Sequence, residues 1–433
     1  MPLTRSLLLS VVVTLVSAGP QFQRPSDEAQ KAVGEAFKLQ ADGKYLAAIS
    51  MLEKIDTNAN EADTSYVGQL LATLYSYVGE QEKTERIFHD ADPGLATKAG
   101  DQTPALETAA AVDAIEEIVR LARDRQIVIL NEAHHVPRHR AFSLLLAREL
   151  RKIGYEYFAA ETFADEIPEL WRQGFPSRRA GFYTAEPVFG DLVRQAMALG
   201  YTPVAYEARK PAAPDADEAD RVNTREIQQA QNLVDRVFKI NPKAKLFIHC
   251  GYSHATENWA KTKDGRDHAW MAARLGRLTG IDPLTIDQTK DTPTAIAAED
   301  SPEYLAAEKG GPLTRPTVFR KANGGYLVTG DYRDKIDVGV FHPRERRVNG
   351  RPDWLAMNGY RKPLEIAPNL LPKERVLLQA FVASEPADAI PIDQLIVDAP
   401  ASAPVLMLPP GAYRIVVQKA DGSSANIAEV VQR

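Results

Sequence analysis

The feature that most constrains the fold is a short apolar run in residues 127–139, which read IVILNEAHHVPRH. Four apolar residues, three of them β-branched, lead directly into Asn131, Glu132, Ala133, His134 and His135. This pattern is typical of a buried strand in a parallel sheet that ends in a loop. Residues 138–153 then carry apolar side chains at helical spacing and stop before Gly154, which predicts a helix with a glycine C-cap. Because ligands bind at the carboxyl ends of strands in open α/β sheets, the carboxylate and imidazoles predict chemistry at this loop.

Strand and helix patterns alternate through the middle of the chain. Further strands are predicted at residues 155–160, 201–206, 245–248 and 284–286. Helices are predicted from residue 112 to 122 and at residues 188–199, 222–240 and 268–278. This alternation predicts the α/β class, with a mostly parallel sheet, right-handed crossovers and flanking helices. We assign this domain, which we expect to be catalytic, to residues 112–345.

The region before this domain, residues 26–94, is helical by pattern. It contains two units of apolar residues at helical spacing, around Gly43-Lys44 and Gly79-Glu80 respectively. The units lie roughly one tetratricopeptide period apart, and each resembles the helix–turn–helix of that repeat. Because two such units make a poor solenoid, we expect them to pack on a neighbour or to dimerise. The region is then either a module that binds a protein partner or a helical cap.

The segments that flank the α/β domain have a different character. Residues 95–111 contain Ala, Gly, Pro and acidic side chains and are predicted to be a linker. Residues 288–314 predict an irregular or weakly helical insertion, and residues 317–341 alternate like strands, with a hairpin turn at Asn323-Gly324-Gly325. Residues 346–433 form a β-rich region with strand-like runs at 376–382, 405–408 and 413–418. We expect a small β-sandwich-like appendage there, with a role in interaction or in packing.

Composition and charge exclude some classes of protein. The 433 residues suffice for two or three domains, and 44% hydrophobic with 25% charged residues is typical of a globular protein. A net charge of -6 and a pI near 5.9 argue against a nucleic-acid binder. The single cysteine, Cys250, excludes an internal disulfide, and we expect it to be a small buried residue and not a nucleophile.

The first residues predict export. Arg5 provides a positive start, residues 7–16 are an apolar run, and Val16-Ser17-Ala18 is a small-residue cleavage site. The apolar run is too short for a comfortable membrane span. We therefore expect a signal peptide at residues 1–18, a periplasmic or secreted protein, and no stable membrane span after cleavage. The alternative is an uncleaved anchor.

Four successive predicted strands end in ionisable residues. The residues are Glu132 with His134 and His135, then Glu161, then Glu207, and then His249 and His254. Because parallel strands bring their carboxyl ends to one edge of a sheet, we expect these side chains to form a shared site. Carboxylates next to imidazoles stabilise each other's charged forms or bind a cation.

Three motifs in this order resemble a known superfamily. They are Asn131-Glu132-Ala133-His134-His135, Ala159-Ala160-Glu161-Thr162 and Cys250-Gly251-Tyr252-Ser253-His254. They are similar to the domain shared by erythromycin esterases, ChaN-like haem-binding proteins and Tiki/TraB proteins. Those families carry Gly-Glu-x-x-His or Gly-x-x-His after the first strand, a Glu after the second, and a late Gly-x-x-His. The resemblance covers residues 112–286.

The chain departs from the family pattern at two points. Asn131 stands where the families have Gly, and the two adjacent histidines allow two registers. In the esterase register Glu132 and His135 form Glu-x-x-His, whereas in the Tiki register residues 131–134 stand as x-x-x-His, with Asn131 in the place of the Gly. Residues 223–226, Asn-Thr-Arg-Glu, also resemble an Arg-bearing segment of the esterases.

The esterase resemblance implies a hydrolase that activates water without a covalent intermediate, on a small-molecule or peptide substrate. His135 or His134 would be the general base, with Glu132 and Glu161 orienting or stabilising it. The substrate side would comprise His254 and Arg225, together with Glu207 and His249. The sequence contains no Gly-x-Ser-x-Gly motif, which argues against an acyl-serine route.

The other two resemblances imply different functions. The Tiki resemblance implies a metal-dependent hydrolase or peptidase, with a divalent metal held by Glu132, His134, Glu161 and His254. The ChaN resemblance implies a non-enzymatic binder of haem or another ligand. The residues also have structural interpretations: Glu132 as a helix cap, His135 and His139 as solvent-facing side chains, and His249 as a core histidine.

Overall fold

The computed structural model describes residues 24–433 except 57–60, 92–102, 214, 295–299 and 399–402. The predicted signal peptide, residues 1–18, and part of the predicted linker therefore lie outside the described residues. The chain divides into two compact units, one of Met1–Ala96 with Gly359–Arg433 and one of Thr97–Asn358. Among the helices of the described residues, none combines the length and the apolar content that a membrane crossing needs.

A six-stranded parallel sheet forms the centre of the Thr97–Asn358 unit. Its strand order is β10-β8-β2-β5-β3-β4, and each neighbouring pair is parallel. The strands are β2 (Ile127–Glu132), β3 (Tyr157–Ala160), β4 (Thr202–Ala205), β5 (Leu246–Gly251), β8 (Leu284–Asp287) and β10 (Val338–Gly339). The unit is thus α/β with a parallel sheet, as the alternation of patterns predicts.

The two central strands are buried along their whole length. All six residues of β2 and all six of β5 are buried, which explains the apolar runs at residues 127–130 and 246–248. Their register places Glu132 opposite Gly251, and the register of β3 with β5 places Ala160 opposite His249. The carboxyl ends of β2, β5 and β3 are therefore level with one another.

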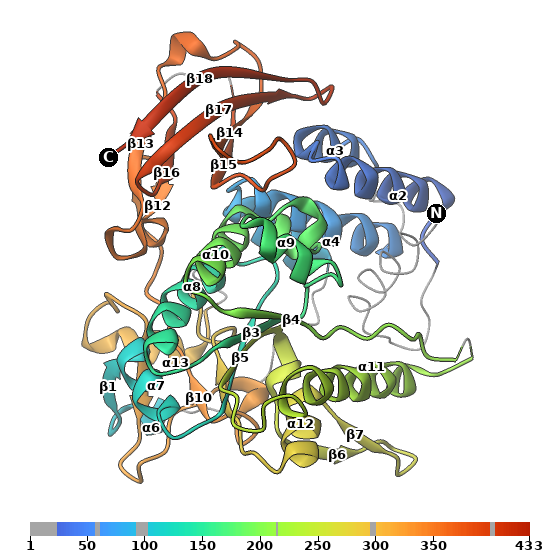
Figure 1. Ribbon diagram of the computed structural model, residues 1–433, viewed down its shortest axis with the longest axis vertical. Coiled ribbons are helices and arrows are strands. Elements are labelled where there is room, and N and C mark those ends of the chain that lie inside the picture. Colours follow the sequence, from blue (N-terminus) through green and yellow to red (C-terminus); the bar gives the residue numbers. More distant parts are fainter. Residues whose placement is uncertain (1–23, 57–60, 92–102, 214, 295–299, 399–402) are drawn as a thin grey trace. The chain divides into compact units, whose positions relative to one another are not determined.

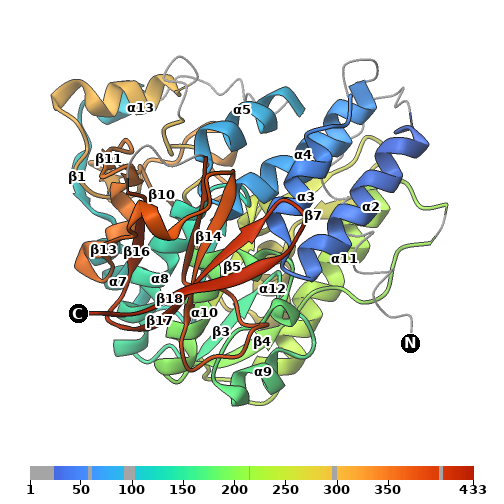
Figure 2. The ribbon, with the colours of Figure 1, turned by 90° about the horizontal axis from the view of Figure 1, so that it is seen from above.

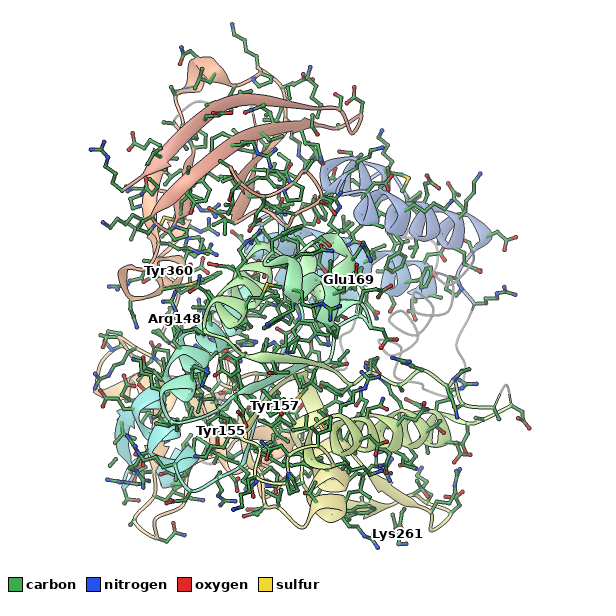
Figure 3. The ribbon with its side chains drawn as sticks, viewed as in Figure 1. Arg148, Tyr155, Tyr157, Glu169, Lys261 and Tyr360 are labelled. Carbon is green, nitrogen blue, oxygen red and sulfur yellow. The ribbon has the colours of Figure 1, made fainter. Side chains whose placement is uncertain are left out.

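Helices cover both faces of the sheet (Figure 1). One face carries α7 (Ala114–Ala122), α8 (Pro137–Lys152) and α10 (Pro187–Ala198), and the other carries α11 (Glu218–Leu233) and α12 (Met271–Thr279). This division follows from right-handed crossovers, because the chain moves across the sheet in opposite directions before and after β4. Arg148 of α8 (labelled in Figure 3) donates a hydrogen bond to Gln195 of α10 at 2.9 Å and joins these neighbours.

Helix starts differ from those that periodicity predicts, and hydrogen bonds explain why. The Asp113 side chain accepts from Glu116 N and caps α7, after the short strand β1 (Ala110–Asp113). Asp217 caps α11 in the same way, so this helix begins before residue 222, and its last turn is the π-helix Val234–Phe238. The prediction of a helix from residue 268 is wrong at its start, because β7 (Asp267–Ala269) pairs with β6 (Trp259–Lys261).

Residues after β8 belong to the same unit. They include α13 (Pro302–Ala307) and β9 (Thr317–Arg320), which pairs antiparallel with β1. The predicted turn is present: Lys321 N donates to Gly325 O at 2.7 Å, and Gly324 has a φ of 87°. The following strand is β10, which pairs with β8 and forms one edge of the parallel sheet. The alternation of residues 317–341 predicts strands there but does not indicate that one of them joins this sheet.

The other unit combines both ends of the described chain (Figure 2). Its helices are α2 (Asp27–Ala41), α3 (Tyr45–Leu52), α4 (Glu61–Tyr77) and α5 (Gln81–Ala91). Its four-stranded antiparallel sheet has the order β15-β14-β17-β18, formed by β14 (Val376–Val382), β15 (Asp393–Val397), β17 (Gly411–Lys419) and β18 (Ser424–Gln432). A second pair joins β13 (Lys362–Glu365) to β16 (Val405–Leu408).

Amide side chains of the sheet hold the helices in this unit. Gln418 of β17 accepts a hydrogen bond from Leu46 N at 3.1 Å and donates one to Gly43 O at 2.9 Å. Gln394 of β15 donates to Tyr77 O at the end of α4 at 2.9 Å. The helical region and the β-rich region, which the sequence treats as separate domains, are therefore parts of one compact unit. Tetratricopeptide character remains a prediction.

Candidate functional site

The ends of the parallel strands bring the ionisable side chains to one edge of the sheet. Glu132 is the last residue of β2, Glu161 follows β3 directly, and Glu207 follows β4 after one intervening residue. His254 lies in the 3₁₀ turn Tyr252–Ala255 that follows β5. Arg225 of α11 lies between Glu161 and Glu207 and connects them, and Glu161 also contacts His254.

Glu132 and His134 form a directly contacting pair. Glu132 Oε1 lies 2.8 Å from His134 Nδ1, and Arg140 of α8 donates to both oxygens of Glu132, at 2.8 and 3.1 Å. Burial opposes ionisation of Glu132, but Arg140 and His249 outweigh it and hold the pKa of this carboxyl well below its usual range. Because an ionised carboxylate only accepts hydrogen bonds, Nδ1 carries the proton and Nε2 is left as a base.

The His134 ring is enclosed by two tyrosines and a glycine. Tyr183 stacks on it with 4.0 Å between ring centroids and 11° between planes, and Tyr252 lies edge-on at 5.4 Å. A Cβ atom added at Gly251 would lie 2.5 Å from His134 Nε2 and 3.2 Å from Glu161 Oε2. Only glycine leaves room here for the imidazole, and both polar atoms reach the same small space above Gly251.

Glu161 is held in its ionised form. One oxygen accepts a hydrogen bond from Gly251 N at 2.7 Å, and the other pairs with Arg225 and lies 3.4 Å from His254 Nε2. Burial opposes the charge on Glu161, but His254 and Arg225 outweigh it and hold the pKa of this carboxyl well below its usual range. Arg225 also donates to Glu207 at 2.7 and 3.1 Å. Arg225 and Glu207 keep about a fifth of their side-chain surface exposed, 21% and 23%.

Two carboxylates favour the cationic form of His254. Its Nδ1 lies 2.8 Å from Glu226 Oε2, which also accepts a hydrogen bond from Met271 N. Burial lowers the pKa of His254, but Glu161 and Glu226 outweigh burial and raise it to about 10. Sequence reasoning missed Glu226 as a site residue, although it is part of the quoted segment 223–226 and directly follows Arg225.

The remaining histidines have other environments. His135 Nδ1 lies 3.3 Å from the Tyr252 hydroxyl, and burial, His134 and Arg140 lower the pKa of His135 to about 3. His249 is buried behind Glu132, with Nε2 2.9 Å from its carboxylate and Nδ1 3.1 Å from Ser143 Oγ. His249 therefore contacts Glu132 from inside the protein and does not lie on the exposed side that a substrate would approach.

The prediction that His139 faces solvent is wrong. His139 is fully buried in the first turn of α8, where Nδ1 accepts a hydrogen bond from Ala133 N at 3.0 Å. Its Nε2 lies 2.9 Å from Thr292 Oγ1. The imidazole thus stabilises the backbone of the loop that carries Glu132 and His134. Cys250 is buried, as the sequence predicts.

Asn131 connects three strand ends. Its amide nitrogen donates to Asp287 Oδ1 at 2.7 Å and to Tyr252 O at 3.1 Å, and its oxygen accepts from Gln288 N at 2.9 Å. Tyr252 has a φ of 38°, a left-handed conformation that is costly for a bulky residue. Asn131 thereby holds Tyr252 in this conformation beside His134.

The donor atoms do not fit a resident divalent metal in this arrangement. In the described part of the chain, no three His, Cys, Asp or Glu side chains are grouped as metal ligands. Arg140 binds both oxygens of Glu132, and a protonated His254 has no lone pair to offer. The carboxylates of the proposed ligand set, Glu132 and Glu161, are instead paired with Arg140 and Arg225.

Comparisons with known proteins give only distant similarity. No family model and no curated protein matches the chain. A solved structure described as bacterial protein toxins matches at 19% identity and a TM-score of 0.31, over 49% of this chain and 46% of that one. The type III effector HopBA1 matches at 14% and 0.28, over 42% of this chain and 86% of that one.

A third solved structure is RRSP, a MARTX toxin effector domain from Vibrio vulnificus CMCP6, at 15% identity and a TM-score of 0.30. It is matched over 53% of this chain and 50% of that one. The chain thus spans about half the length of the first and third of these proteins. TM-scores of this size carry no argument about function. A proposal about function must therefore be based on the geometry of the site.

Proposed function

We propose that this protein is a hydrolase in which His134, oriented by Glu132, removes a proton from water. The observation that carries the proposal is the 2.8 Å contact between Glu132 and His134 Nδ1, which leaves Nε2 as the base. Arg140 keeps Glu132 ionised, so the carboxylate stabilises the imidazolium that forms when Nε2 takes the proton. General-base catalysis of this kind contributes about 10²–10⁴-fold to the rate.

The charges around the pair support the rest of the reaction. Water above Gly251 would contact both His134 Nε2 and Glu161 Oε2, which converge there. The water oxygen attacks the carbonyl carbon of an ester or amide, while its proton passes to His134. The oxyanion that develops faces the cations His254 and Arg225, whose N–H groups favour negative charge. His134 then returns the proton to the leaving group as the carbonyl re-forms.

His134 is a better candidate for the base than His135. A histidine whose pKa is about 3, as for His135, is neutral but accepts a proton weakly at neutral pH. His135 also has no carboxylate at Nδ1, which instead lies near the Tyr252 hydroxyl. The proposed pair is therefore Glu132 with His134. It differs from the esterase register, which pairs Glu132 with His135, and from the Tiki register, which has no glutamate partner for His134.

The motif order adds a proposal about family and location. We infer that the Thr97–Asn358 unit is related to the erythromycin esterase, ChaN-like and Tiki/TraB superfamily, because the three motifs follow β2, β3 and β5 in the family order. We also infer export, on the basis of the apolar first residues and their small-residue cleavage site. Intact Met1 in the mass spectrum of the exported protein would contradict cleavage.

The test is a hydrolysis screen with matched variants. The purified protein is assayed on a panel of esters, lactones and peptides, alongside His134→Ala and His135→Ala and with metal analysis of each preparation. We expect turnover of at least one substrate, a loss of at least about 100-fold for His134→Ala, and retention of most activity in His135→Ala. Bound metal, together with loss of activity on chelation, would instead favour the Tiki-type reaction. Haem binding without turnover would favour the ChaN-type function.

A further inference from the structure

The ring of Tyr183 covers one face of the His134 imidazole. The two rings are nearly parallel, with 11° between their planes and 4.0 Å between their centroids. Tyr183 is almost fully buried, and burial, Glu161, Tyr252 and Glu132 all raise the pKa of its hydroxyl, so the phenol stays neutral. A neutral aromatic ring presents an electron-rich face to its neighbour.

The backbone that carries Tyr183 is fixed to the end of β3. Tyr183 N donates a hydrogen bond to Thr162 Oγ1 at 2.9 Å, one residue after Glu161. Gly181 lies against the same threonine, because a Cβ added there would be only 1.9 Å from Thr162 O, and its φ of 153° also favours glycine. The position of Tyr183 is thus tied to the residue that follows Glu161.

The same segment also supports Glu132. Glu186, three residues after Tyr183, caps α10 by accepting from Val188 N and Phe189 N, each at 2.8 Å. It lies 3.3 Å from Arg140 Nη1, and Arg140 binds both oxygens of Glu132. Residues 183–186 therefore support both members of the Glu132–His134 pair: Tyr183 stacks on His134, and Glu186 contacts the arginine that binds Glu132.

We propose that Tyr183 is a positioning residue that favours the imidazolium form of His134 through the face of its ring. This inference rests on the proposed function, in which His134 is neutral before the proton transfer and cationic after it. An aromatic face attracts a cation more strongly than a neutral ring, so Tyr183 stabilises the protonated state selectively. Such an interaction strengthens toward the transition state and raises kcat more than it lowers KM.

A graded series at position 183 tests the ring face without changing the shape of the side chain. Tyr183→Phe removes only the hydroxyl, and replacement of that ring by 4-fluorophenylalanine and then 3,4,5-trifluorophenylalanine withdraws electrons stepwise. The charged and titratable groups facing His134 keep their identity throughout the series; they are Glu132, Glu161, His135, Tyr252 and Arg140, whose guanidinium also lies over the Tyr183 ring, 5.9 Å from its centroid. The same fluorinated residues at Phe163, whose ring packs on Phe158 and Trp171, serve as the control.

The first measurement needs no substrate: NMR titration of the protein labelled with ¹⁵N-histidine. We expect the titration midpoint of the His134 ring to fall by roughly half a pH unit from Phe to trifluorophenylalanine, and the Phe163 series to leave it unchanged. The second measurement is kcat on whichever panel substrate is turned over. We expect kcat to fall by about 3- to 10-fold along the series, the acid limb of its pH profile to move to lower pH, and KM to stay constant.

The outcomes separate this inference from the proposed function. A midpoint that does not change along the position-183 series, or one that changes equally in the Phe163 series, overturns the role of the ring face. If the midpoint falls but His134→Ala retains turnover, the stacking effect is supported and the proposed function is refuted. Thermal unfolding within a few degrees of wild type checks that each variant is folded.

Discussion

Gly251→Ala is the sharpest single perturbation of the site. Gly251 has φ −84° and ψ 144°, which alanine adopts without strain, so the backbone should not change. The new Cβ would lie 2.5 Å from His134 Nε2 and 2.6 Å from His134 Cε1. Because non-bonded carbon atoms prefer about 3.5–4.0 Å, the imidazole must move by roughly 1 Å.

This displacement sets the size of the expected effect. A misplacement of about 1 Å in a catalytic group costs roughly 100-fold in rate, so we expect kcat to fall by about that factor. Overpacking typically costs about 1–3 kcal/mol of unfolding free energy, and the low end applies because 14% of the His134 side chain is exposed and can move outward. The variant should therefore fold and unfold near the wild-type temperature.

The assay is turnover of the panel substrate, combined with thermal unfolding. Gly276→Ala in α12 is the matched control, because its Cβ would make only ordinary contacts of 3.5 and 3.6 Å. We expect this control to keep full activity and to gain about 0.5–1 kcal/mol in stability. The double variant Gly251→Ala with His134→Ala should be no slower than His134→Ala alone. Wild-type activity in Gly251→Ala would refute the assignment of His134 as the base.

Three further predictions concern Glu161, His254 and Gln418. Glu161→Gln keeps an acceptor for Gly251 N but removes the charge that pairs with Arg225 and His254, so it should lower the melting temperature and reduce activity by orders of magnitude; full activity would exclude a role for this carboxylate in the reaction. The pKa of His254 is raised from 6.5 to about 10 by its carboxylate partners, so its stabilising contribution is complete below pH 6.5 and is lost as pH rises through about 10. Urea unfolding of wild type should show this decline, and His254→Asn should remove it. Gln418→Ala should lower the free energy of unfolding of the unit that holds both chain ends by about 1–3 kcal/mol, because it leaves Gly43 O and Leu46 N without their partner. The matched control is Gln432→Ala on the edge strand β18, which should lower it by less than about 0.5 kcal/mol.

Sequence patterns alone located the edge of the sheet at which the candidate site lies. The apolar runs at β2 and β5 predict buried parallel strands, and the polar residues that follow them must then lie at one edge. The sequence predicts Glu132, Glu161 and His254 at this edge, because each follows or ends a run of apolar strand residues. Such patterns are local, and burial of a strand or helix face is enough to impose them.

The partners of these residues were decided by the tertiary structure. Nothing near Glu132 in the sequence shows that Arg140 holds both of its oxygens, that Tyr183 covers His134, or that Glu226 makes His254 a cation. The contacts of Tyr183 with His134 and of Glu226 with His254 join segments that come together only after the crossovers have packed on the sheet, and Arg140 reaches Glu132 only because the loop after β2 folds back, so none of these residue types carries a periodic signal.

The same reason applies to the choice between the two histidines and to the arrangement of the domains. His134 and His135 are equivalent in the sequence, and only the structure shows that the ring of His134 contacts Glu132 whereas the ring of His135 lies near the Tyr252 hydroxyl. The sequence predicts the helical start and the β-rich end as separate regions. In the structure they form one unit, because Gln418 and Gln394 of the sheet bind backbone groups of the helical region. The sequence by itself determined the elements and the edge at which their polar ends meet, whereas long-range packing determined which side chains touch and therefore which of them carry charge.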